Sequence, residues 1–422
     1  MRVLIVNTSE RTGGAAIAAN RLLHALNNHG VEAHMLVRDR KTDAANVVNI
    51  APSWRHKANF LWERGVIWLA NGLSKQNIFQ VDIANAGTDI TSMAAFKQAD
   101  VIHLHWVNQG YLSLDDIDRI LASGKTVVVT MHDQWYFTGI CHYSGECDKY
   151  RSQCSRCPML KGGGFGMDLA RRVFDRKRAM YQGRNLTFVG CSQWIADFAR
   201  TSPLTLGHKV TNIPNAIDID VFSPADSAEA RRKHHLPEDK RLLLFGAQRI
   251  TDERKGFRYL AEACDHILRA YPDLADHLGV VVLGGDAESV KTALPLPVYA
   301  VNYLSNEQEI AELYNAVDLF VTPSLQDNLP NTLVEAMACG RPCIGFDVGG
   351  IPEMIHHQQD GYVARNRDGQ DFAQGIVWCL DNDRHPALCA AARANALATY
   401  GEAAVAQRYQ AIYQSALQKK DY

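Results

Sequence analysis

The sequence predicts two doubly wound α/β domains, each built on a parallel sheet covered by helices. Short apolar runs alternate with helical patterns along the chain, which is typical of parallel strands joined by crossover helices. A chain of 422 residues also exceeds what one ordinary hydrophobic core holds. The helix breakers Pro214, Asn215 and Pro224 lie between the two series of runs and predict a domain boundary near 205–225.

Apolar runs mark the expected strands. They cover residues 3–6, 101–104, 126–130 and 186–189 in the first half, and residues 242–245, 280–283, 319–322 and 343–346 in the second. Apolar residues at helical spacing over 402–419 predict a terminal amphipathic helix. In open parallel sheets, ligands bind beyond the carboxyl ends of the strands, so the loops after these runs are the expected place for chemistry.

The composition is that of a globular, nearly neutral protein. Hydrophobic residues make up 47% and charged residues 21%, and the formal net charge is −2. This balance argues against a nucleic-acid-binding domain, because such domains usually carry a strong surplus of basic residues. The opening MRVLIVNTSE lacks the long apolar stretch of a signal peptide, and no run approaches the roughly 18 apolar residues of a membrane span. We therefore expect a cytoplasmic protein whose ten cysteines are reduced thiols or metal ligands.

The most informative stretch covers residues 319–353, LFVTPSLQDNLPNTLVEAMACGRPCIGFDVGGIPE. A helix is expected to begin near Pro330, which suits a first helical position, and to end at Gly340. The backbone N–H groups of its first turn, from Asn331, Thr332 and Leu333, are expected to face the preceding loop. Such a helix start binds phosphate, because its free N–H groups and partial positive charge attract anions.

Three charged side chains are expected beside this helix start. Glu335 lies a little over one turn into the helix, where a carboxylate can accept hydrogen bonds from a vicinal diol such as ribose. Arg249 and Lys255 follow the run 242–245, and fixed cations there would stabilise the charge of a diphosphate leaving group without a metal. The alternatives are an exposed glutamate on a plain helix and a solvated cluster of loop charges.

The segment 249–353 resembles the donor domain of glycosyltransferase family 4, the retaining sugar transferases of the GT-B fold. The family's basic pair falls here on Arg249 and Lys255, and its acidic pair on Asp327 and Glu335. PNAID at 214–218, ELYNAVDLFVTPS at 312–324 and GGIPEMI at 349–355 match it as well. The resemblance implies two Rossmann-like domains facing a central cleft, with the basic pair on the diphosphate. It further implies that Glu335 holds the ribose and that Asp327 faces the transferred sugar.

Two departures from the family pattern bear on the donor. The family usually has glutamate at Asp327 and glycine-phenylalanine-glycine at the donor-contacting positions Asn328, Leu329 and Pro330. Pro330 has no N–H, so one backbone contact to the donor is expected to be missing. These changes bear on the identity of the donor sugar more than on the type of reaction.

The resemblance implies retention through front-face attack, in which a phosphate oxygen of the donor takes the acceptor proton. A nucleophilic Asp327 is the alternative.

Small residues and histidines follow the first-half runs. Gly13 and Gly14 allow close approach of a ligand, and the resemblance places them beside the phosphates and the acceptor, although a tight turn also explains them. The three-glycine fingerprint of dinucleotide-binding proteins is absent. His132 is expected to donate hydrogen bonds to the transferred sugar, as the matching family histidine would, or to be a structural histidine. We expect His103 to be structural and His105 to reach the cleft.

A cysteine cluster, CHYSGECDKYRSQCSRC, contains Cys141, Cys147, Cys154 and Cys157. Four thiolates this close in a reducing compartment suit a tetrahedral structural zinc, while free or redox-active thiols and disulfides remain open. The surrounding TMHDQWYFTGICHYSGECDKY resembles a bacterial exopolysaccharide branch of the family, of the colanic-acid type. Asp218 and Asp220 spell the metal-binding Asp-x-Asp of another transferase fold, but they lie in the linker, so no catalytic metal is expected.

Two stretches combine basic residues with features of a membrane-surface segment. Residues 171–178, RRVFDRKR, form a compact basic segment. The stretch 54–75 mixes tryptophans and cations, namely Trp54, Trp62, Trp68, Arg55, Lys57, Arg64 and Lys75. Both could meet anionic headgroups or a lipid-linked acceptor at the inner face of the cytoplasmic membrane, and an ordinary packed or solvated helix is the alternative.

We therefore expect an acceptor-side domain at 1–205 with a cysteine-rich insert at 139–160, a nucleotide-sugar-binding domain at 206–395, and a C-terminal helix at 396–422 that returns to the first domain. The expected activity transfers a sugar from a UDP- or GDP-linked donor to a saccharide or lipid-linked acceptor in cell-surface polysaccharide synthesis. The rival functions are a nucleotide-sugar 2-epimerase of the same fold and a non-catalytic sugar-nucleotide-binding protein.

Overall fold

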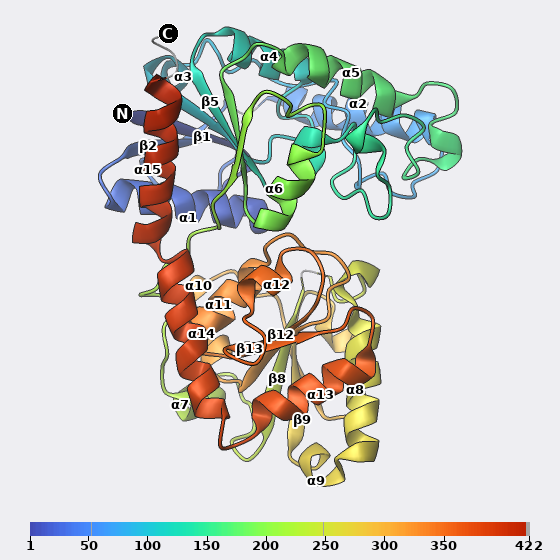
Figure 1. Cartoon of the computed structure of the whole chain (residues 1–422), viewed down its shortest axis with the longest axis vertical. Helices are drawn as coiled ribbons and strands as arrows, with labels where there is room; N and C mark the ends of the chain where they lie inside the picture. The colour runs from blue at the N-terminus through green and yellow to red at the C-terminus, as the bar shows by residue number, and fades with distance from the viewer. Residues whose placement is uncertain (52, 248, 419–422) are drawn as a thin grey trace. The chain divides into compact units, whose positions relative to one another are not determined.

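The computed structural model describes residues 1–51, 53–247 and 249–418, which form two compact units (Figure 1). The first unit comprises Met1–Ala216 and the C-terminal segment from Val405, and the second comprises Ile217–Ala404. Each unit contains one main sheet in which all neighbouring strands run parallel. The expected fold class is confirmed.

The first sheet has the strand order β3-β2-β1-β4-β5-β6-β7. Its strands are β1 (Arg2–Ser9), β2 (Glu32–Asp39), β3 (Val47–Asn49), β4 (Val101–Leu104), β5 (Thr126–Met131), β6 (Leu186–Gly190) and β7 (Lys209–Asn212). The four runs expected as strands form β1, β4, β5 and β6. The other three strands were not predicted, because β3 and β7 are short and polar residues interrupt the apolar pattern of β2, EAHMLVRD.

Helices cover both faces of this sheet. They are α1 (Gly14–Asn28), α2 (Trp54–Ala70), α3 (Ala94–Gln98), α4 (Leu114–Ala122), α5 (Leu169–Tyr181), α6 (Gln193–Arg200) and α15 (Glu402–Gln418). Because successive strand residues point to opposite faces, Leu4 and Val6 join a core with α2, α4, α5 and α6, while Val3 and Ile5 join a core with α1 and α15.

The C-terminal helix α15 is anchored in the first unit by two tyrosines. The hydroxyl of Tyr409 lies 2.8 Å from Oγ1 of Thr130, and the hydroxyl of Tyr413 lies 2.8 Å from Nδ1 of His103. Nε2 of His103 lies 2.7 Å from the same Thr130 hydroxyl, so a closed set of hydrogen bonds links β4, β5 and α15. His103 is fully buried and is used structurally, as expected.

The unit boundaries differ from the expected ones at both ends. β7 pairs with β6, so part of the expected linker 205–225 is an edge strand, and the first unit continues to Ala216. Its residues are half-exposed or exposed, and they therefore carry little of the apolar signal of an inner strand. Residues 396–400, expected in the returning helix, belong to α14 (His385–Tyr400) of the second unit.

The second sheet has the order β10-β9-β8-β11-β12-β13. Its strands are β8 (Arg241–Gly246), β9 (Leu278–Leu283), β10 (Val298–Val301), β11 (Leu319–Thr322), β12 (Cys343–Phe346) and β13 (Gly361–Ala364). The helices are α7 (Ser227–Lys233), α8 (Phe257–Ala270), α9 (Pro272–Ala275), α10 (Glu307–Asn315), α11 (Asn331–Ala338), α12 (Ile351–Met354), α13 (Gly369–Leu380) and α14. The four expected runs form β8, β9, β11 and β12; the outer strands β10 and β13 were not predicted.

Each sheet has one point where the direction of strand addition reverses. In the first sheet it lies between β1 and β4, and in the second between β8 and β11. The loops that leave two adjacent strands there diverge to opposite sides, and ligands of open α/β sheets bind at such points. The loops 247–256 and 323–330 of the second unit are therefore the first place to look for a site.

Candidate functional site

Lys255 and Asp327 meet where the loops after β8 and β11 lie together. Nζ of Lys255 donates to Oδ2 of Asp327 at 2.7 Å, and the guanidinium of Arg254 lies 3.7 Å from the same oxygen. Arg254 also donates to the carbonyl of Gln326 at 2.9 Å, and the N–H of Leu325 donates to the carbonyl of Arg254 at 2.8 Å. The two loops at the reversal point are thus fastened to each other.

The charge on Asp327 is set by these neighbours. Burial opposes ionisation of the carboxyl, but Lys255 and then Arg254 attract the negative charge and hold the pKa of Asp327 below its usual value. Asp327 is therefore an ionised carboxylate at neutral pH. Arg254 also lies 3.7 Å from Asp252, so the two cations face two carboxylates, and an anionic ligand here would share the cations with them.

Two glycines allow three loops to approach Asp327 closely. Gly256 has φ +68°, and a Cβ there would lie 1.9 Å from the carbonyl oxygen of Pro323. Gly349, in the loop after β12, has φ +61°, and a Cβ there would lie 1.7 Å from the carbonyl oxygen of Asp327. The N–H of Gly350 donates to that oxygen at 3.1 Å. Both positions require glycine on conformational and steric grounds.

Helix α11 begins one residue later than expected. Pro330 is its N-cap, and Asn331 is the first helical residue. The N–H of Leu333 donates to the carbonyl of Pro330 at 3.0 Å, so the prediction that this N–H is left for a ligand is wrong. A first turn can close in this tighter way when no side chain caps it, as here. Asn331 and Thr332 are half-buried in that turn.

The end of α11 is as expected. Gly340 has φ +70°, its N–H donates to the carbonyl of Met337 at 2.9 Å, and the N–H of Arg341 donates to the carbonyl of Ala336 at 2.9 Å. This pairing closes the helix, and Pro342 follows directly. A helix of eight residues therefore runs from the loop that carries Asp327 to β12.

Glu335 is buried, not exposed. Its Oε2 accepts a hydrogen bond of 2.9 Å from the hydroxyl of Tyr314 on α10. Burial and the adjacent carboxylate raise the pKa of Tyr314 well above its usual value, so the phenol stays protonated and donates. Sequence reasoning missed Tyr314 as a site residue, although it lies inside the motif ELYNAVDLFVTPS. A buried carboxylate in a fixed orientation can recognise a diol, because the partner groups lose little freedom on binding.

The remaining site residues of the second unit lie in the same loops. Asn328 and Leu329 are buried, and the N–H of Asn328 donates to Oδ1 of Asp327 at 3.1 Å. Arg249 is exposed, in a loop that Asp286 holds by accepting the N–H of Ile250 at 2.9 Å. In the part of the chain that the structure describes, no carboxylate pairs with Arg249. Arg254, which the sequence analysis did not select, is the arginine beside Asp327.

Gly13 and Gly14 begin α1 at the reversal point of the first sheet. Gly13 has φ +92° and ψ 161°, caps the helix, and has no atom within 4 Å of the position of a Cβ. Its carbonyl accepts the N–H groups of Ala16 and Ile17, both at 3.1 Å. The conformation explains why Gly13 is glycine, and the open space beside it leaves room for a ligand to approach the backbone.

His132 is paired inside the first unit. Its Nε2 lies 2.9 Å from Nδ1 of His105, and its Nδ1 lies 3.4 Å from Sγ of Cys191. Burial lowers the pKa of His132 to about 4 and places the pKa of His105 well below its usual value, so both rings are neutral at physiological pH. These contacts favour a structural histidine. A role as hydrogen-bond donor to a sugar requires one of them to break, and it stays a prediction.

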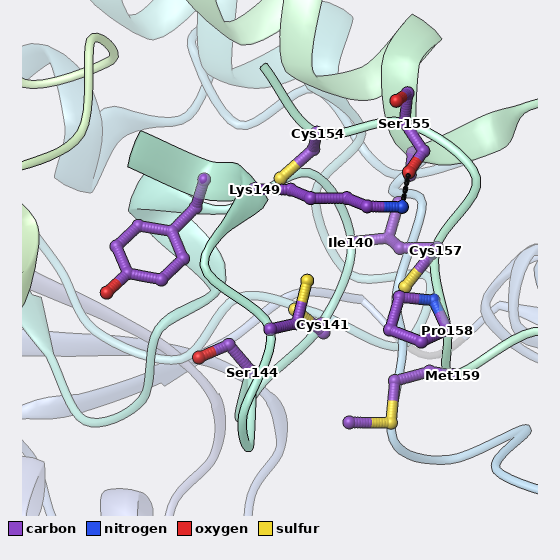
Figure 2. A pocket seen from close by; sticks show the side chains of 12 residues that line it. Ile140, Cys141, Ser144, Lys149, Cys154, Ser155, Cys157, Pro158 and Met159 are labelled. Carbon is purple, nitrogen blue, oxygen red and sulfur yellow. Dashed lines mark hydrogen bonds between the residues drawn. The ribbon is translucent and has the colours of Figure 1, made fainter. Parts of the chain in front are cut away.

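The four clustered cysteines line one small cavity of about 20 Å³ in the first unit (Figure 2). Figure 2 shows Cys141, Cys154 and Cys157 around this space. Lys149 reaches along it and donates to the carbonyls of Ser155 at 3.0 Å and Arg156 at 3.2 Å. Among the described residues, no three His, Cys, Asp or Glu side chains already stand with the spacing of a metal site. The four thiols are thus gathered but not arranged as ligands, and zinc stays a prediction.

The Asp-x-Asp of the linker forms a turn. Oδ1 of Asp218 accepts the N–H groups of Asp220 at 3.0 Å and Val221 at 3.1 Å. A carboxylate that bonds to the backbone two and three residues later is a common turn device, so this sequence has a local structural explanation.

Part of the second unit is similar to a family of known proteins. Residues 239–382 match the family described as Glycosyl transferases group 1. The chain is 30% identical over 223 residues to a D-inositol 3-phosphate glycosyltransferase of Thermobispora bispora, covering 50% of this chain and 51% of that protein. It is 27% identical over 215 residues to the N-acetyl-alpha-D-glucosaminyl L-malate synthase of Bacillus anthracis, covering 49% and 54%. The chain thus spans about half the length of these curated relatives.

Solved structures share the whole fold. A sucrose-phosphate synthase from Thermosynechococcus elongatus has a TM-score of 0.66 at 16% identity, covering 98% of each chain. Alr3699/HepE of Anabaena, solved with UDP and glucose, has a TM-score of 0.62 at 14% identity, covering 98% of this chain and 100% of that one. Identities this low show similarity of fold alone. The chain has the fold of the GT-B glycosyltransferases, and its residues 239–382 are similar to the group 1 glycosyl transferases.

Proposed function

We propose that this protein is a retaining glycosyltransferase. It would move a sugar from a nucleotide-diphosphate sugar to a saccharide or lipid-linked acceptor in cell-surface polysaccharide synthesis in the cytoplasm. The observation that carries the proposal is the pairing of Lys255 with the buried Asp327 at the reversal point of the second sheet, next to the start of α11. It lies inside the segment that matches the group 1 glycosyl transferases.

The diphosphate would bind beside the cations of these loops. Lys255 and Arg254, which also face Asp327 and Asp252, would contact the phosphates, and the first turn of α11 adds the partial positive charge of a helix start. The exposed Arg249 is free to turn toward a bound phosphate because no carboxylate in the described part of the chain holds it. We assign the ribose diol to Glu335, whose orientation Tyr314 fixes.

The transfer step breaks the bond between the sugar C1 and the donor phosphate oxygen, and the diphosphate leaves with the electron pair. The acceptor oxygen bonds to C1 on the same face, and its proton passes to a phosphate oxygen of the donor. Lys255 and Arg254 would stabilise the negative charge that develops on the diphosphate. A carboxylate already paired with two cations is a weakened nucleophile, so the state of Asp327 favours front-face transfer over a covalent intermediate.

Two classes of acceptor are compatible with this reaction. The relatives named above act, by their names, on D-inositol 3-phosphate and on L-malate, which are small anionic acceptors. The resemblance of the cysteine-rich segment to an exopolysaccharide branch instead favours a saccharide or a lipid-linked saccharide. An acceptor panel that contains all of these classes separates the two cases.

The test begins with donor binding. Thermal shifts with UDP, GDP and their glucose, galactose, mannose and N-acetylglucosamine derivatives identify the donor. Glu335→Gln and Lys255→Ala are each expected to remove the shift, while Lys291→Ala, at an exposed lysine of the same unit, should keep it.

In the second step, the donor is incubated with the protein alone and then together with acceptors. Slow release of free sugar that accelerates with an acceptor supports a transferase, whereas a new nucleotide sugar identifies an epimerase and an unchanged donor identifies a binding protein.

We propose separately that Cys141, Cys147, Cys154 and Cys157 bind one structural zinc ion. Support comes from the chemistry of the donors, four thiols, and from their position around a cavity about the size of one water molecule. Zinc would link parts of the insert that already pack, through Tyr150 and Leu160, against the main core of the first unit. No catalytic step depends on this ion.

A further inference from the structure

Helix α2 exposes large apolar side chains along one face. Trp54 is 78% exposed and Trp62 is 63% exposed, and both project into solvent. We call the following set the α2 apolar face: Trp54, Leu61, Trp62, Trp68, Leu69 and Leu73. Spacings of seven and eight residues place the helical members on one side of the helix. Single exposed apolar residues are ordinary, but a continuous stripe of this kind is not.

The opposite face of α2 is buried and carries both charged and apolar residues. Glu63 and Arg64 point inward, where Arg64 pairs with the buried Asp82 and donates to the carbonyl of Val81 at 3.0 Å. Oε1 of Glu63 accepts the N–H groups of Ile83 at 2.9 Å and Ala84 at 2.6 Å. The same inner face also carries Ile67 and Ala70, which are fully buried in the core of the first unit. The helix is thus already anchored by its inner face, and an ordinary surface helix then has polar residues outside. The outward apolar face is therefore not what folding of the first unit alone would produce.

The neighbouring loops extend the same surface. The ring of Phe165 lies over Gly72, where a Cβ would come within 2.6 Å of it, and both Phe165 and Phe79 are well exposed. The N–H of Lys161 donates to Oδ1 of Asn71 at 2.6 Å, and Asn77 donates to the carbonyl of Met159 at 3.1 Å. These bonds hold residues 159–165, which follow the cysteine cluster, against the end of α2.

The charges on this surface are all of one sign. Its exposed cations are Arg55, Lys57, Lys75 and Lys161. In residues 53–80 and 158–167 the sequence contains one acidic residue, Glu63, which is buried. Tryptophan rings prefer the boundary between water and lipid, and lysine and arginine attract anionic headgroups. Apolar rings surrounded by cations without exposed carboxylates match the chemistry of an anionic lipid surface.

The second basic stretch of the first unit does not share this character. On α5, Arg176 pairs with Asp115 at 3.1 Å and Asp118 at 3.0 Å. Lys177 is fully buried and donates to backbone carbonyls, among them that of Gly139 at 3.1 Å. The described stretch 171–178 thus has a buried lysine and an arginine paired with two aspartates, and it exposes no large apolar side chain, so it lacks the combination found on α2.

We propose that the α2 apolar face, together with Phe79, Phe165 and the surrounding cations, docks the protein onto an anionic phospholipid bilayer. No described helix has the length and apolarity to cross a membrane, so the contact would be peripheral. A second copy of the chain is disfavoured as the occupant, because two such surfaces facing each other across a two-fold axis would bring like charges together. The proposal does not rest on the transferase activity, since vesicles test it without a donor.

The experiment is flotation of the full chain with lipid vesicles. On vesicles that contain about one third phosphatidylglycerol in phosphatidylcholine, we expect about tenfold more bound protein than on phosphatidylcholine alone, and a decrease with added salt. Trp54→Ser/Trp62→Ser and Arg55→Glu/Lys57→Glu are each expected to reduce binding by about tenfold. The matched controls are Leu206→Ser, at an exposed apolar residue of the same unit, and Arg232→Glu/Arg269→Glu, at exposed arginines of the second unit.

Circular dichroism confirms that each variant is folded, and light scattering measures its mass. Equal binding by wild type and the tryptophan variant, or no preference for anionic vesicles, would overturn the proposal. So would a dimer that the tryptophan substitutions dissociate, because this result assigns the surface to a second copy of the chain.

Discussion

The Nζ atom of Lys255 lies 2.7 Å from Oδ2 of Asp327, and the two residues come from loops that follow adjacent strands. Seventy-two positions separate them along the chain. The pair brings a fixed cation and a buried carboxylate together at the one point of the second sheet where the strand order reverses. Such a position suits a charged ligand, because the backbone of both loops is already fastened there.

Removal of Lys255 is expected to destabilise the second unit. Lys255→Ala leaves the buried carboxylate of Asp327 with only the more distant Arg254 as its cation. Because Lys255 is itself partly exposed to solvent, we expect the unfolding free energy to fall by only about 2 kcal/mol. Asp327→Asn combined with Lys255→Ala should recover part of this loss. Denaturant unfolding at pH 7 measures it, with Lys291→Ala as the control. If the double variant loses as much unfolding free energy as the two single variants together, the two residues are not coupled and the account is contradicted.

The same pair predicts the dependence of stability on pH. The pKa of Asp327 is lower in the folded state than its unfolded value of about 3.9, so the carboxylate stabilises the fold above that value. This contribution is lost as the pH falls through the lower, folded-state pKa. The difference in stability between wild type and Asp327→Asn should therefore be constant from about pH 7 to about pH 5 and shrink below about pH 4. A constant difference down to pH 2 would show that the carboxylate is not held by its cations.

Gly349 is expected to tolerate no side chain. Gly349→Ala would place a Cβ 1.7 Å from the carbonyl of Asp327 in a backbone conformation that alanine disfavours, so the two loops must separate. Gly183 has a similar φ of +69° with open space around it, and Gly183→Ala should cost about 1 kcal/mol from the conformation alone. Gly349→Ala should cost clearly more and should also weaken donor binding. Equal unfolding midpoints of the two variants would contradict the close approach.

Tyr314→Phe should affect donor binding through Glu335. The substitution keeps the ring contacts with Phe222 and Phe320 but removes the hydroxyl that donates to Oε2. A lost hydrogen bond to a carboxylate costs about 1.5 kcal/mol, and a Glu335 that lacks this donor should raise the KM for the donor sugar nucleotide about tenfold. Tyr303→Phe, at an exposed tyrosine of the same unit, is the control. An unchanged KM would show that Tyr314 does not orient the carboxylate for the ribose.

The zinc proposal is tested by elemental analysis of protein purified without a histidine tag. We expect about one zinc per chain, lost in Cys154→Ser/Cys157→Ser, and a lower unfolding temperature after chelation. Cys264→Ser, at a buried cysteine outside the cluster, should keep the metal. If all four clustered cysteines of the native protein react with a thiol reagent and no metal is found, they are free thiols and the zinc proposal is wrong.

The sequence predicted the inner part of both sheets well. The strands of this inner part are apolar runs buried on both faces, and such runs can be recognised from the sequence alone. They are β1, β4, β5, β6, β8, β9, β11 and β12. The outer strands were missed because residues such as Lys209 and Thr211 of β7 face solvent and break the apolar pattern. Their pairing depends on neighbours that lie far away in the sequence.

The site could be predicted as far as its location. Asp327 and Lys255 were placed at one edge of the second sheet because each follows a strand, but their direct pairing depends on how the two loops fold. Arg254 and Tyr314 were missed for the same reason, since each is defined by a contact across the fold. The N–H of Leu333 was assigned to a ligand because the sequence could not show that the first turn of α11 closes on Pro330.

The most direct test of the central claim is sugar transfer from the donor that the thermal-shift panel identifies. With a suitable acceptor, wild-type protein should form a glycoside that keeps the anomeric configuration of the donor, and Asp327→Asn should lower kcat by about 100-fold or more while still binding the nucleotide. Donor binding by wild type that leads to neither transfer nor hydrolysis with any acceptor class, or an Asp327→Asn variant with unchanged kcat, would contradict the account.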